Sequence, residues 1–284
     1  MSGFRVAAIT DEFSPDLETA ARAMASLGMT GAELRMVCGR NIIDLTDREI
    51  DGAAAILRGH GLSVVSIASP LLKCVLPDAP EVDTRYQQDM FAAEHTMADQ
   101  PRLARRALEI AGRTGARIIR VFSFWRTVRP EACFDRTVKA LAGLAEQAAP
   151  AGVTIGIENE HACNVGTASE AARVLAAVPH PNLQLIWDPA NALVAGESPF
   201  PEGYGKLPVS RIAHVHAKDC RVTGHTPEWL ELGTGSIDWR GQIAALRRDG
   251  YRGWFSLETH WRGPAGDKLE ASTICGRNLL RMVQ

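Results

Sequence analysis

Four polar residues each end a short apolar run in the second half of the sequence. They are Glu158, Asp188, His216 and Glu258, and we call them the quartet. Two glutamates, one aspartate and one histidine at successive strand ends form a ligand set for a divalent cation. Two of the carboxylates could also exchange protons with a substrate held on that cation. The pattern therefore predicts a metal site with acid–base capacity.

Short runs rich in Val, Ile and Leu recur along the chain, and each is followed by a helical pattern. They predict strands at residues 4–10, 31–36, 62–69, 116–123, 152–158, 182–188, 210–217 and 253–258. Most of these strands begin about 28 to 36 residues apart, which is the length of one βα unit. The alternation predicts an α/β protein with one domain, a (β/α)8 TIM barrel spanning residues 1–284.

An open, doubly wound sheet is the alternative to a barrel. Such a sheet would be expected to carry a glycine-rich phosphate turn after an early strand. The chain instead reads Thr10-Asp-Glu-Phe-Ser-Pro15 after its first strand. The later Gly233-Thr-Gly235 is too short for a dinucleotide fingerprint and is interpreted as a plain turn. The barrel is therefore favoured.

Helix boundaries are marked by caps in the sequence. Thr46–Glu49 and Thr167–Glu170 fit the capping box, in which each side chain satisfies a free backbone N–H group. Glycine tolerates the left-handed conformation that ends a helix. Glycines at such helix ends, shortly before the next strand, are Gly28, Gly61, Gly115, Gly152 and Gly250.

The segment 73–101 is the least regular part of the chain. It contains Pro77, Pro80 and Pro101 and has no clear apolar period. As an insertion between the third strand and its helix, it would lie on the face where barrel active sites form. A lid over the substrate and a passive surface excursion are both open interpretations.

Strand parity predicts where the quartet points. Side chains alternate along a strand, so residues two apart share a face. In the strand 152–158, Ile155 and Ile157 share an apolar face, while Gly156 and Glu158 share the other. The three other strands sort in the same way, with the apolar face suited to the outer helices. The quartet then points inward at the C-terminal mouth, where the catalytic groups of such barrels gather.

Composition and charge exclude several classes of protein. The net charge is −2 and long basic runs are absent, so neither nucleic acid nor a membrane surface is an expected partner. Six cysteines lie far apart without a C-x-x-C pair and are expected to be reduced thiols. A signal sequence and a run of eighteen apolar residues are both lacking, so a cytoplasmic location is expected.

The strings that contain the quartet resemble those of a known family. They are Ile157-Glu-Asn-Glu160, Trp187-Asp-Pro-Ala-Asn191, His214-Val-His-Ala-Lys-Asp219 and Leu257-Glu-Thr-His260. With them the chain resembles the xylose-isomerase-like sugar isomerase/epimerase family of TIM barrels over essentially its whole length. The resemblance implies one divalent metal ion held by the quartet, with Glu158 and Glu258 as the proton-transfer pair. It also suggests a homodimer or homotetramer.

Two positions depart from the ketose 3-epimerases of this family. Asn191 stands where those enzymes have a histidine, and Arg221 does not follow His216 at the spacing of their substrate arginine. Inosose dehydratases and hydroxypyruvate isomerases therefore stay open as relatives. The DNA-repair endonucleases of the superfamily need an Asp-x-His pair that residues 219–225 lack, so a nuclease is not expected.

The ligand types indicate which ion and which reaction to expect. Three carboxylates and one imidazole suit Mn²⁺, Mg²⁺ or Co²⁺, with Zn²⁺ as an option. A hydroxy-ketone derived from a sugar or polyol could chelate the ion through adjacent oxygens, which would stabilise the enediolate formed on proton loss. Expected substrate contacts are Glu160, His161, Asn191, Lys218, Arg221, His260 and Trp125. Glu33 and Arg35 are interpreted as no more than an ion pair with each other.

Three functions follow from these parts. The leading hypothesis is a metal-dependent sugar or polyol isomerase or epimerase, in which one glutamate removes a proton and the other returns it. Departure of a β-hydroxyl after proton removal would make the same parts an inosose-dehydratase-type lyase. The third hypothesis is a barrel that binds a sugar-like ligand without converting it.

Overall fold

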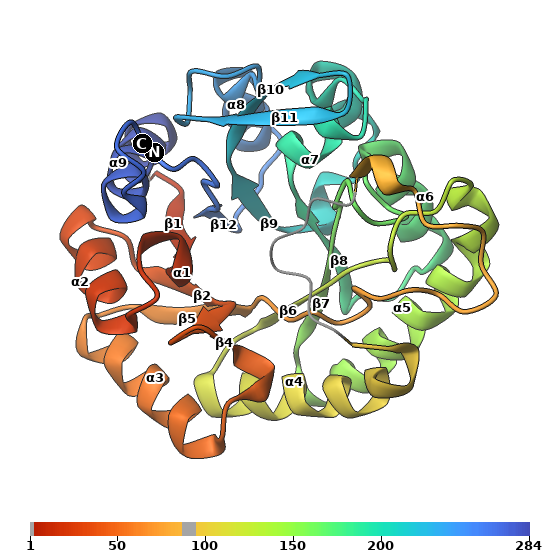
Figure 1. The fold of residues 1–284 in the computed structure, drawn as a ribbon, viewed down its shortest axis with the longest axis horizontal. Coiled ribbons are helices and arrows are strands. Elements are labelled where there is room, and N and C mark those ends of the chain that lie inside the picture. Colours follow the sequence, from red (N-terminus) through yellow and green to blue (C-terminus); the bar gives the residue numbers. More distant parts are fainter. Residues whose placement is uncertain (1–2, 87–94) are drawn as a thin grey trace.

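The computed structural model describes residues 3–86 and 95–284, and it contains a closed barrel of parallel strands. The barrel strands are β1 (Arg5–Ile9), β2 (Gly31–Leu34), β5 (Ser63–Ile67), β6 (Ile118–Val121), β7 (Thr154–Glu158), β8 (Leu183–Trp187), β9 (Ile212–Ala217) and β12 (Trp254–Leu257). They close in the order β1-β12-β9-β8-β7-β6-β5-β2 (Figure 1). Each lies within the range predicted for it, so the (β/α)8 prediction is confirmed.

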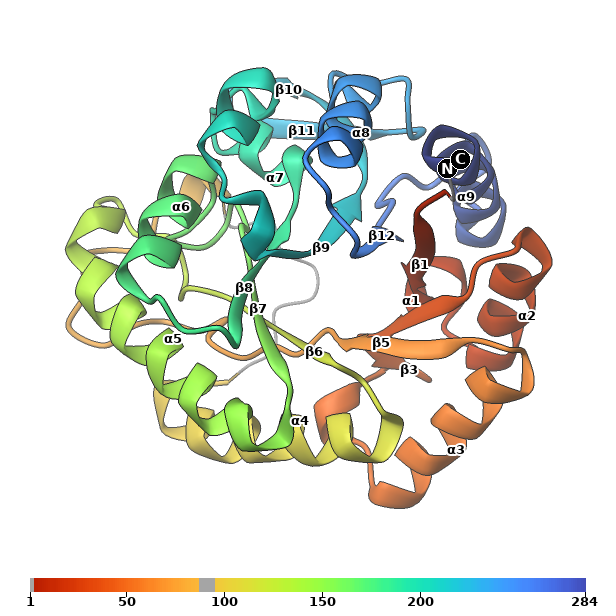
Figure 2. The ribbon, with the colours of Figure 1, turned by 180° about the vertical axis from the view of Figure 1, so that it is seen from behind.

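Helices surround the barrel, as the views from both ends show (Figures 1 and 2). The α-helices are α1 (Thr10–Phe13), α2 (Leu17–Leu27), α3 (Asp47–Gly59), α4 (Gln100–Thr114), α5 (Phe134–Ala148), α6 (Ala168–Ala177), α7 (Pro189–Val194), α8 (Trp239–Arg248) and α9 (Lys268–Val283). Short 3₁₀ turns are η1 (Ile42–Asp44), η2 (Thr84–Tyr86), η3 (Met97–Asp99), η4 (Pro130–Cys133), η5 (Ala149–Ala151), η7 (Tyr204–Lys206) and η8 (Val209–Arg211), and η6 (Pro199–Gly203) is a π-helical turn. Within the described residues, none of the helices is both long and apolar enough to cross a bilayer.

The helix caps lie where the sequence places them. Thr46 and Thr167 each form the complete capping box with the glutamate three residues on. The five predicted terminating glycines all have positive φ values, between 63° and 90°. The last helix returns the chain to its start, because the Phe4 N–H donates to the Val283 carbonyl at 3.2 Å. The local sequence therefore marks these helix boundaries correctly.

Packing in the barrel confirms the parity of the strands. A Cβ atom on Gly156 would lie 2.8 Å from Ile186, so both residues face the interior. Glu158, two residues after Gly156, takes the same face and is buried. Ile155 and Ile157 are buried on the opposite face, in the apolar core shared with the helices. Each such isoleucine contributes roughly 1.5–3 kcal/mol by burial.

The described residues between β5 and α4 are held to neighbouring elements by backbone and side-chain hydrogen bonds. Residues 87–94, in the middle of the predicted insertion, lie outside the described residues. The described flanks contain η2 and η3, and the Asp83 N–H donates to the Arg126 carbonyl at 2.7 Å. The Leu72 N–H donates to Gln100 Oε1 at 2.8 Å. These bonds tie the described parts of the insertion to the loop after β6 and to α4.

Two small hairpins extend the chain beyond the barrel strands: β3 (Met36–Val37) with β4 (Arg40–Asn41), and β10 (Asp219–Thr223) with β11 (Thr226–Leu230). Asp219 anchors the second one. Its buried carboxylate accepts backbone N–H bonds from Cys220, Gly233, Gly235 and Ile237. A Cβ atom on Gly235 would lie 2.2 Å from Asp219 Oδ1. Gly233-Thr-Gly235 lies in a turn, as expected from the sequence, and its backbone also forms one wall of a carboxylate cage around Asp219.

Loss of the Asp219 carboxylate should destabilise the protein. Asp219→Asn should lower the free energy of unfolding by about 2–4 kcal/mol, because an amide cannot accept all of these charge-assisted bonds. In a chain of this size, such a loss lowers Tm by roughly 3–7 °C in calorimetry. The matched control is Asp238→Asn at the N-cap of α8, where asparagine caps as well as aspartate. Equal Tm values for the two variants would contradict the structural role of Asp219.

Candidate metal centre

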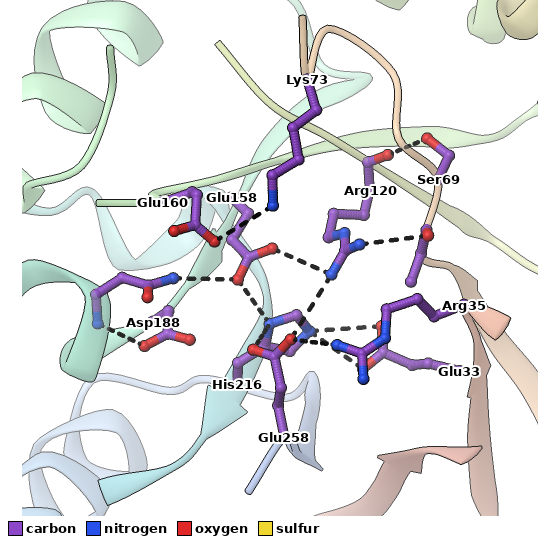
Figure 3. Close-up of polar contacts among 12 residues, drawn as sticks. Glu33, Arg35, Ser69, Lys73, Arg120, Glu158, Glu160, Asp188, His216 and Glu258 are labelled. Atoms are coloured by element: carbon purple, nitrogen blue, oxygen red, sulfur yellow. Dashed lines mark hydrogen bonds and ion pairs between the residues drawn. The ribbon is translucent and has the colours of Figure 1, made fainter. Parts of the chain in front are cut away.

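The quartet comes together at the C-terminal mouth of the barrel. Glu158 ends β7 and His216 lies near the end of β9, while Asp188 and Glu258 directly follow β8 and β12. All four are buried, and one ligand atom from each lies within 4.8 Å of the others. His216 Nδ1 is 3.0 Å from Glu158 Oε1 and 3.4 Å from Glu258 Oε2 (Figure 3). Side chains from four separate βα units therefore converge on one small volume.

Two carboxylate oxygens of the quartet fit a bound cation. Glu158 Oε2 and Asp188 Oδ2 are buried and accept no hydrogen bond within the described residues. Arg120 Nη1 lies 3.4 Å from the first and Lys218 Nζ 2.9 Å from the second, but neither contact has hydrogen-bond geometry. Burying a carboxylate oxygen without a bond is costly. Open oxygen lone pairs beside one imidazole suit a divalent ion such as Mg²⁺, Mn²⁺ or Zn²⁺.

The charge of Lys218 is coupled to the quartet. Its Nζ lies 2.8 Å from Glu258 Oε2, in addition to its contact with Asp188. Burial raises the pKa of Glu258, but Lys218 and His216 more than offset this and hold the pKa well below its ordinary value. The pKa of Asp188 is raised, first by burial and then by the charges of Glu258 and Glu158. Lys218 is thus shared by Asp188 and Glu258, and its charge favours the ionised form of both carboxylates.

Glu33 contacts Nε2 of His216, the ring nitrogen on the side away from the quartet. Its Oε1 lies 3.2 Å from His216 Nε2 and 2.8 Å from His214 Nε2, and all three side chains are fully buried. Burial raises the pKa of Glu33, but the two histidines more than offset this and hold it well below its ordinary value. A carboxylate at one ring nitrogen orients a histidine whose other nitrogen serves as a metal ligand. The arrangement leaves His216 Nδ1 facing the quartet.

Arg35 does not pair with Glu33, and the expectation that it does is wrong. Its guanidinium contacts Asp11 Oδ2 at 2.8 Å, Glu12 Oε1 at 2.5 Å and Glu258 Oε1 at 3.1 Å. Glu33 and Arg35 lie at the C-terminal end of β2, and Glu33 faces inward toward the two histidines instead. The parity rule applied to the second strand would have identified Glu33. The sequence offers no reason to assign Asp11 and Glu12 to the site, because acidic residues in the first turn of a helix are usually capping groups.

Most of the predicted substrate contacts surround the quartet. Glu160 Oε1 lies 2.9 Å from His161 Nδ1, and the same ring nitrogen is 3.0 Å from Asn191 Oδ1. Asn191 Nδ2 donates to Glu158 Oε1 at 3.3 Å. Lys218 lies among the quartet itself. These residues form one polar network on the β7 and β8 side of the mouth.

The remaining predicted contacts divide into two groups. His260 Nε2 lies 3.6 Å from Glu258 Oε1, and its ring stacks on Trp229 at 4.9 Å between centroids. Trp125 lies in the loop after β6, where Lys73 Nζ is 5.6 Å from its ring centroid. Arg221 is not brought to the quartet: its side chain is 59% exposed on β10. It faces Glu228 across the hairpin, because β10 and β11 pair beyond the barrel strands.

Arg120 and Lys73 are site residues that sequence reasoning missed. Arg120 lies in β6 and Lys73 in the loop after β5, and both side chains are buried (Figure 3). The sequence does hold a signal for Arg120, since a charge inside the apolar run Ile118–Val121 is unusual in a buried strand. Lys73 has no comparable signal, because loop lysines are common on protein surfaces.

The fold and the site define a TIM barrel with a candidate metal centre at the carboxyl ends of its strands. Residues 21–274 match the family model described as xylose isomerase-like TIM barrel. The chain belongs to this family, which confirms the resemblance seen in its sequence. Proteins similar to this chain include an inosose dehydratase, a probable 3-DHS dehydratase and a D-allulose 3-epimerase.

Individual relatives differ in activity. An inosose dehydratase from Erwinia tasmaniensis is 29% identical over 138 residues, which cover 43% of this chain and 46% of the dehydratase. The match thus spans about half of that relative's length. The IOLI protein, solved with a zinc atom, has a TM-score of 0.78 at 17% identity, covering 99% of this chain and 98% of its own. D-allulose 3-epimerase from Methylomonas sp. was solved in complex with D-allulose. It has a TM-score of 0.69 at 17% identity, and the match covers 100% of this chain and 98% of the epimerase. At these identities, the likeness to the two solved structures shows the fold alone.

Proposed function

We propose that this chain is a divalent-metal-dependent isomerase or epimerase acting on a hydroxy-ketone derived from a sugar or polyol. The observation that carries the proposal is the quartet, with its buried ligand atoms within 4.8 Å of one another. A set of three carboxylates and one imidazole at the mouth of a barrel is suited to removing a proton next to a carbonyl group. Membership of the xylose isomerase-like family supports the same chemistry.

Each residue has a role in this proposal. The quartet would hold the ion, which when bound supplies a Lewis acid that polarises the carbonyl and stabilises developing negative charge. Glu33 orients His216 through its 3.2 Å contact with Nε2. Asn191 orients Glu158 by donating to Oε1. Glu258, kept ionised by Lys218, accepts the proton from the carbon next to the carbonyl.

The positions of the two glutamates favour epimerisation. In the order of the barrel strands, β12 and β7 are separated by β9 and β8. Glu258 and Glu158 therefore stand on either side of His216 and Asp188. A substrate between them would present one face to each glutamate, so one can remove a proton and the other return it.

A dehydratase is the second candidate, and Lys218 favours it. A β-hydroxyl group needs a proton donor when it leaves, and Lys218 Nζ lies 2.8 Å from Glu258 Oε2, beside the base. Burial lowers the pKa of Lys218, but Asp188 and Glu258 more than offset this and raise it well above its ordinary value. Lys218 therefore keeps its proton unless the leaving oxygen takes it. The inosose dehydratase relative supports this alternative.

Deuterium incorporation separates the candidates. The Mn²⁺-loaded protein is incubated in D₂O with ketoses and inososes, and the products are weighed by mass spectrometry. Label without other mass change indicates an isomerase or epimerase, whereas loss of one water indicates a dehydratase. If ligands bind to the loaded protein but none takes up label, the chain is a binding protein and the proposal fails.

Metal binding should depend on pH through His216. Burial lowers its pKa, but Glu158, Glu33 and Glu258 more than offset this and raise it well above its ordinary value. A ligating imidazole must be neutral, so below this raised pKa each ion displaces a proton. The apparent affinity for Mn²⁺ should therefore rise with pH, by up to about tenfold per unit.

Titration calorimetry between about pH 6 and about pH 8, in buffers of different ionisation enthalpy, measures the affinity for Mn²⁺ and the number of protons released on binding. The expected result is tighter binding at the higher pH, with release of about one proton for His216 at the lower pH. The sign follows from the raised pKa, because the metal-free protein holds the proton that the bound protein must lose. Affinity that falls as pH rises would contradict ligation by His216.

A further inference from the structure

Lys218 places a fixed cation inside the candidate metal centre. It directly follows β9, two residues after His216, so one strand end supplies both a ligand and an ammonium group. Its side chain is only 2% exposed, and Nζ lies 2.8 Å from Glu258 Oε2 and 2.9 Å from Asp188 Oδ2. Lys218 therefore contacts two of the four residues that would hold the ion.

The two contacts of this ammonium group differ in kind. Nζ donates a hydrogen bond to Glu258 Oε2, the oxygen that also lies 3.4 Å from His216 Nδ1. Asp188 Oδ2 accepts no hydrogen bond within the described residues, so its lone pairs stay open to an ion. An ion that binds Glu258 through Oε2 would share that oxygen with the ammonium group. Lys218 thus competes directly for one ligand oxygen and only through its charge for the other.

Lys218 is held at both of its ends. Its carbonyl accepts from Trp239 Nε1 at 3.2 Å, and the next residue is Asp219, whose carboxylate is enclosed by four backbone N–H groups. Nζ lies 5.4 Å from the ring centroid of Trp229, which belongs to the β10–β11 hairpin. Moving the ammonium group into water would also deprive two buried carboxylates of a partner, which is costly. We therefore expect this cation to stay beside the quartet when an ion binds.

The charge of Lys218 should weaken metal binding. Two cations that share carboxylates in a buried, poorly solvated volume repel each other. Arg120 also approaches two quartet members, but Nη1 lies 3.4 Å from Glu158 and 3.9 Å from Glu258, further than Lys218 Nζ lies from its own two partners. An ion held by Asp188 and Glu258 would thus meet the charge of Lys218 at short range.

We infer that Lys218 is an internal counter-cation that makes metal loading reversible. It neutralises Asp188 and Glu258 when no ion is bound, and it lowers the affinity of the quartet for a divalent cation. The inference rests on the proposed function, because it takes the quartet as the metal site. The protein is then loaded and emptied as the concentration of the free divalent ion rises and falls.

Lys218→Met tests this inference, because methionine is a long, unbranched side chain without a charge. Titration calorimetry with Mn²⁺ should give a Kd about tenfold or more below the wild-type value, which reverses the usual loss of affinity when a residue next to a metal ligand is changed. The matched control is Lys139→Met, the same change at an exposed lysine of α5. Its charge is screened by salt, so its Kd should stay within about twofold of the wild-type value.

Thermal unfolding provides a second readout. Without an ion, Lys218→Met deprives two buried carboxylates of a cation, so the Tm should fall by about 5–9 °C. Saturating Mn²⁺ should then raise the Tm of the variant more than that of the wild-type protein, because the ion replaces the lost charge and binds more tightly. A lysine with a purely structural role would also lower the Tm, but its loss would loosen the quartet and raise the Kd for Mn²⁺.

An unchanged or higher Kd in Lys218→Met overturns the inference. If circular dichroism shows that this variant is unfolded without Mn²⁺, Lys218→Gln takes its place, because an amide can still donate to Glu258 Oε2, and the same fall in Kd is expected. Failure of both variants to fold at saturating Mn²⁺ also overturns the inference. The wild-type titration tests the proposed function separately. If the wild-type protein binds no Mn²⁺ but Lys218→Met does, the proposed function fails and the counter-cation stands, and if neither binds Mn²⁺, both fail.

Discussion

Glu258→Gln should stop deuterium exchange into the substrate while the barrel stays folded. General-base catalysis contributes about 10²–10⁴-fold, so the exchange rate should fall by at least that factor. Glutamine keeps the volume of the side chain, and its one carbonyl oxygen can still accept from either Arg35 or Lys218. Arg35 also keeps its contacts with Asp11 and Glu12. The rate is measured by mass spectrometry in D₂O, and folding by circular dichroism.

The control is Glu197→Gln, which changes a glutamate in the loop after α7 that accepts hydrogen bonds from the first residues of α6. Glu197 accepts a hydrogen bond from the Ala168 backbone N–H at 2.6 Å. The substitution should therefore lower stability without changing the exchange rate. Metal content is determined for both variants, because Glu258 is also a proposed ligand. In an epimerase, Glu158→Gln should block exchange from the opposite epimer. Full exchange in a metal-loaded Glu258→Gln protein would remove Glu258 from the role of base.

Asp188→Asn should abolish stable metal binding and leave the fold intact. Asp188 is both a member of the quartet and the N-cap of α7, where Oδ1 accepts from the Asn191 N–H at 2.9 Å. Asparagine caps a helix about as well as aspartate but is a much poorer ligand for a hard cation. The affinity for Mn²⁺ should fall by about 10²-fold or more, by analogy with the loss of charged groups around metal sites. Calorimetry and elemental analysis measure this loss.

The second readout is the Tm of the metal-free protein. Burial and the charges of Glu258 and Glu158 raise the pKa of Asp188, which means that its charged form is disfavoured in the metal-free protein. Replacing this carboxylate by an amide should therefore cost little stability. The metal-free Tm should therefore stay within about 3 °C of the wild-type value, as for a change near 1 kcal/mol. Asp16→Asn, at the exposed N-cap of α2, is the matched control and should leave metal binding unchanged. Wild-type metal affinity in Asp188→Asn would show that the quartet does not hold the ion.

Several site residues could not be assigned from sequence because their partners are distant in the chain. Glu33 meets His214 and His216, about 180 residues later, through the closure of the barrel. Asp11 and Glu12 meet Arg35 across two adjacent βα units. No local pattern encodes such pairs, since only the closed strand order brings these ends together. Arg221 lies on the β10–β11 hairpin, where its exposed side chain faces Glu228, and local sequence did not indicate this hairpin.

The sequence by itself determined the eight strands, their parity, most of the helix caps and the inward direction of the quartet. These properties follow from local rules, because side-chain alternation and capping depend on residues a few positions apart. Tertiary structure alone decided which charges became partners. It set Glu33 against His216, placed Lys218 between Asp188 and Glu258, and put Arg120 and Lys73 against the ring of Phe122. Burial in a shared, poorly solvated volume makes these charges interact strongly, and that volume exists only once the barrel closes.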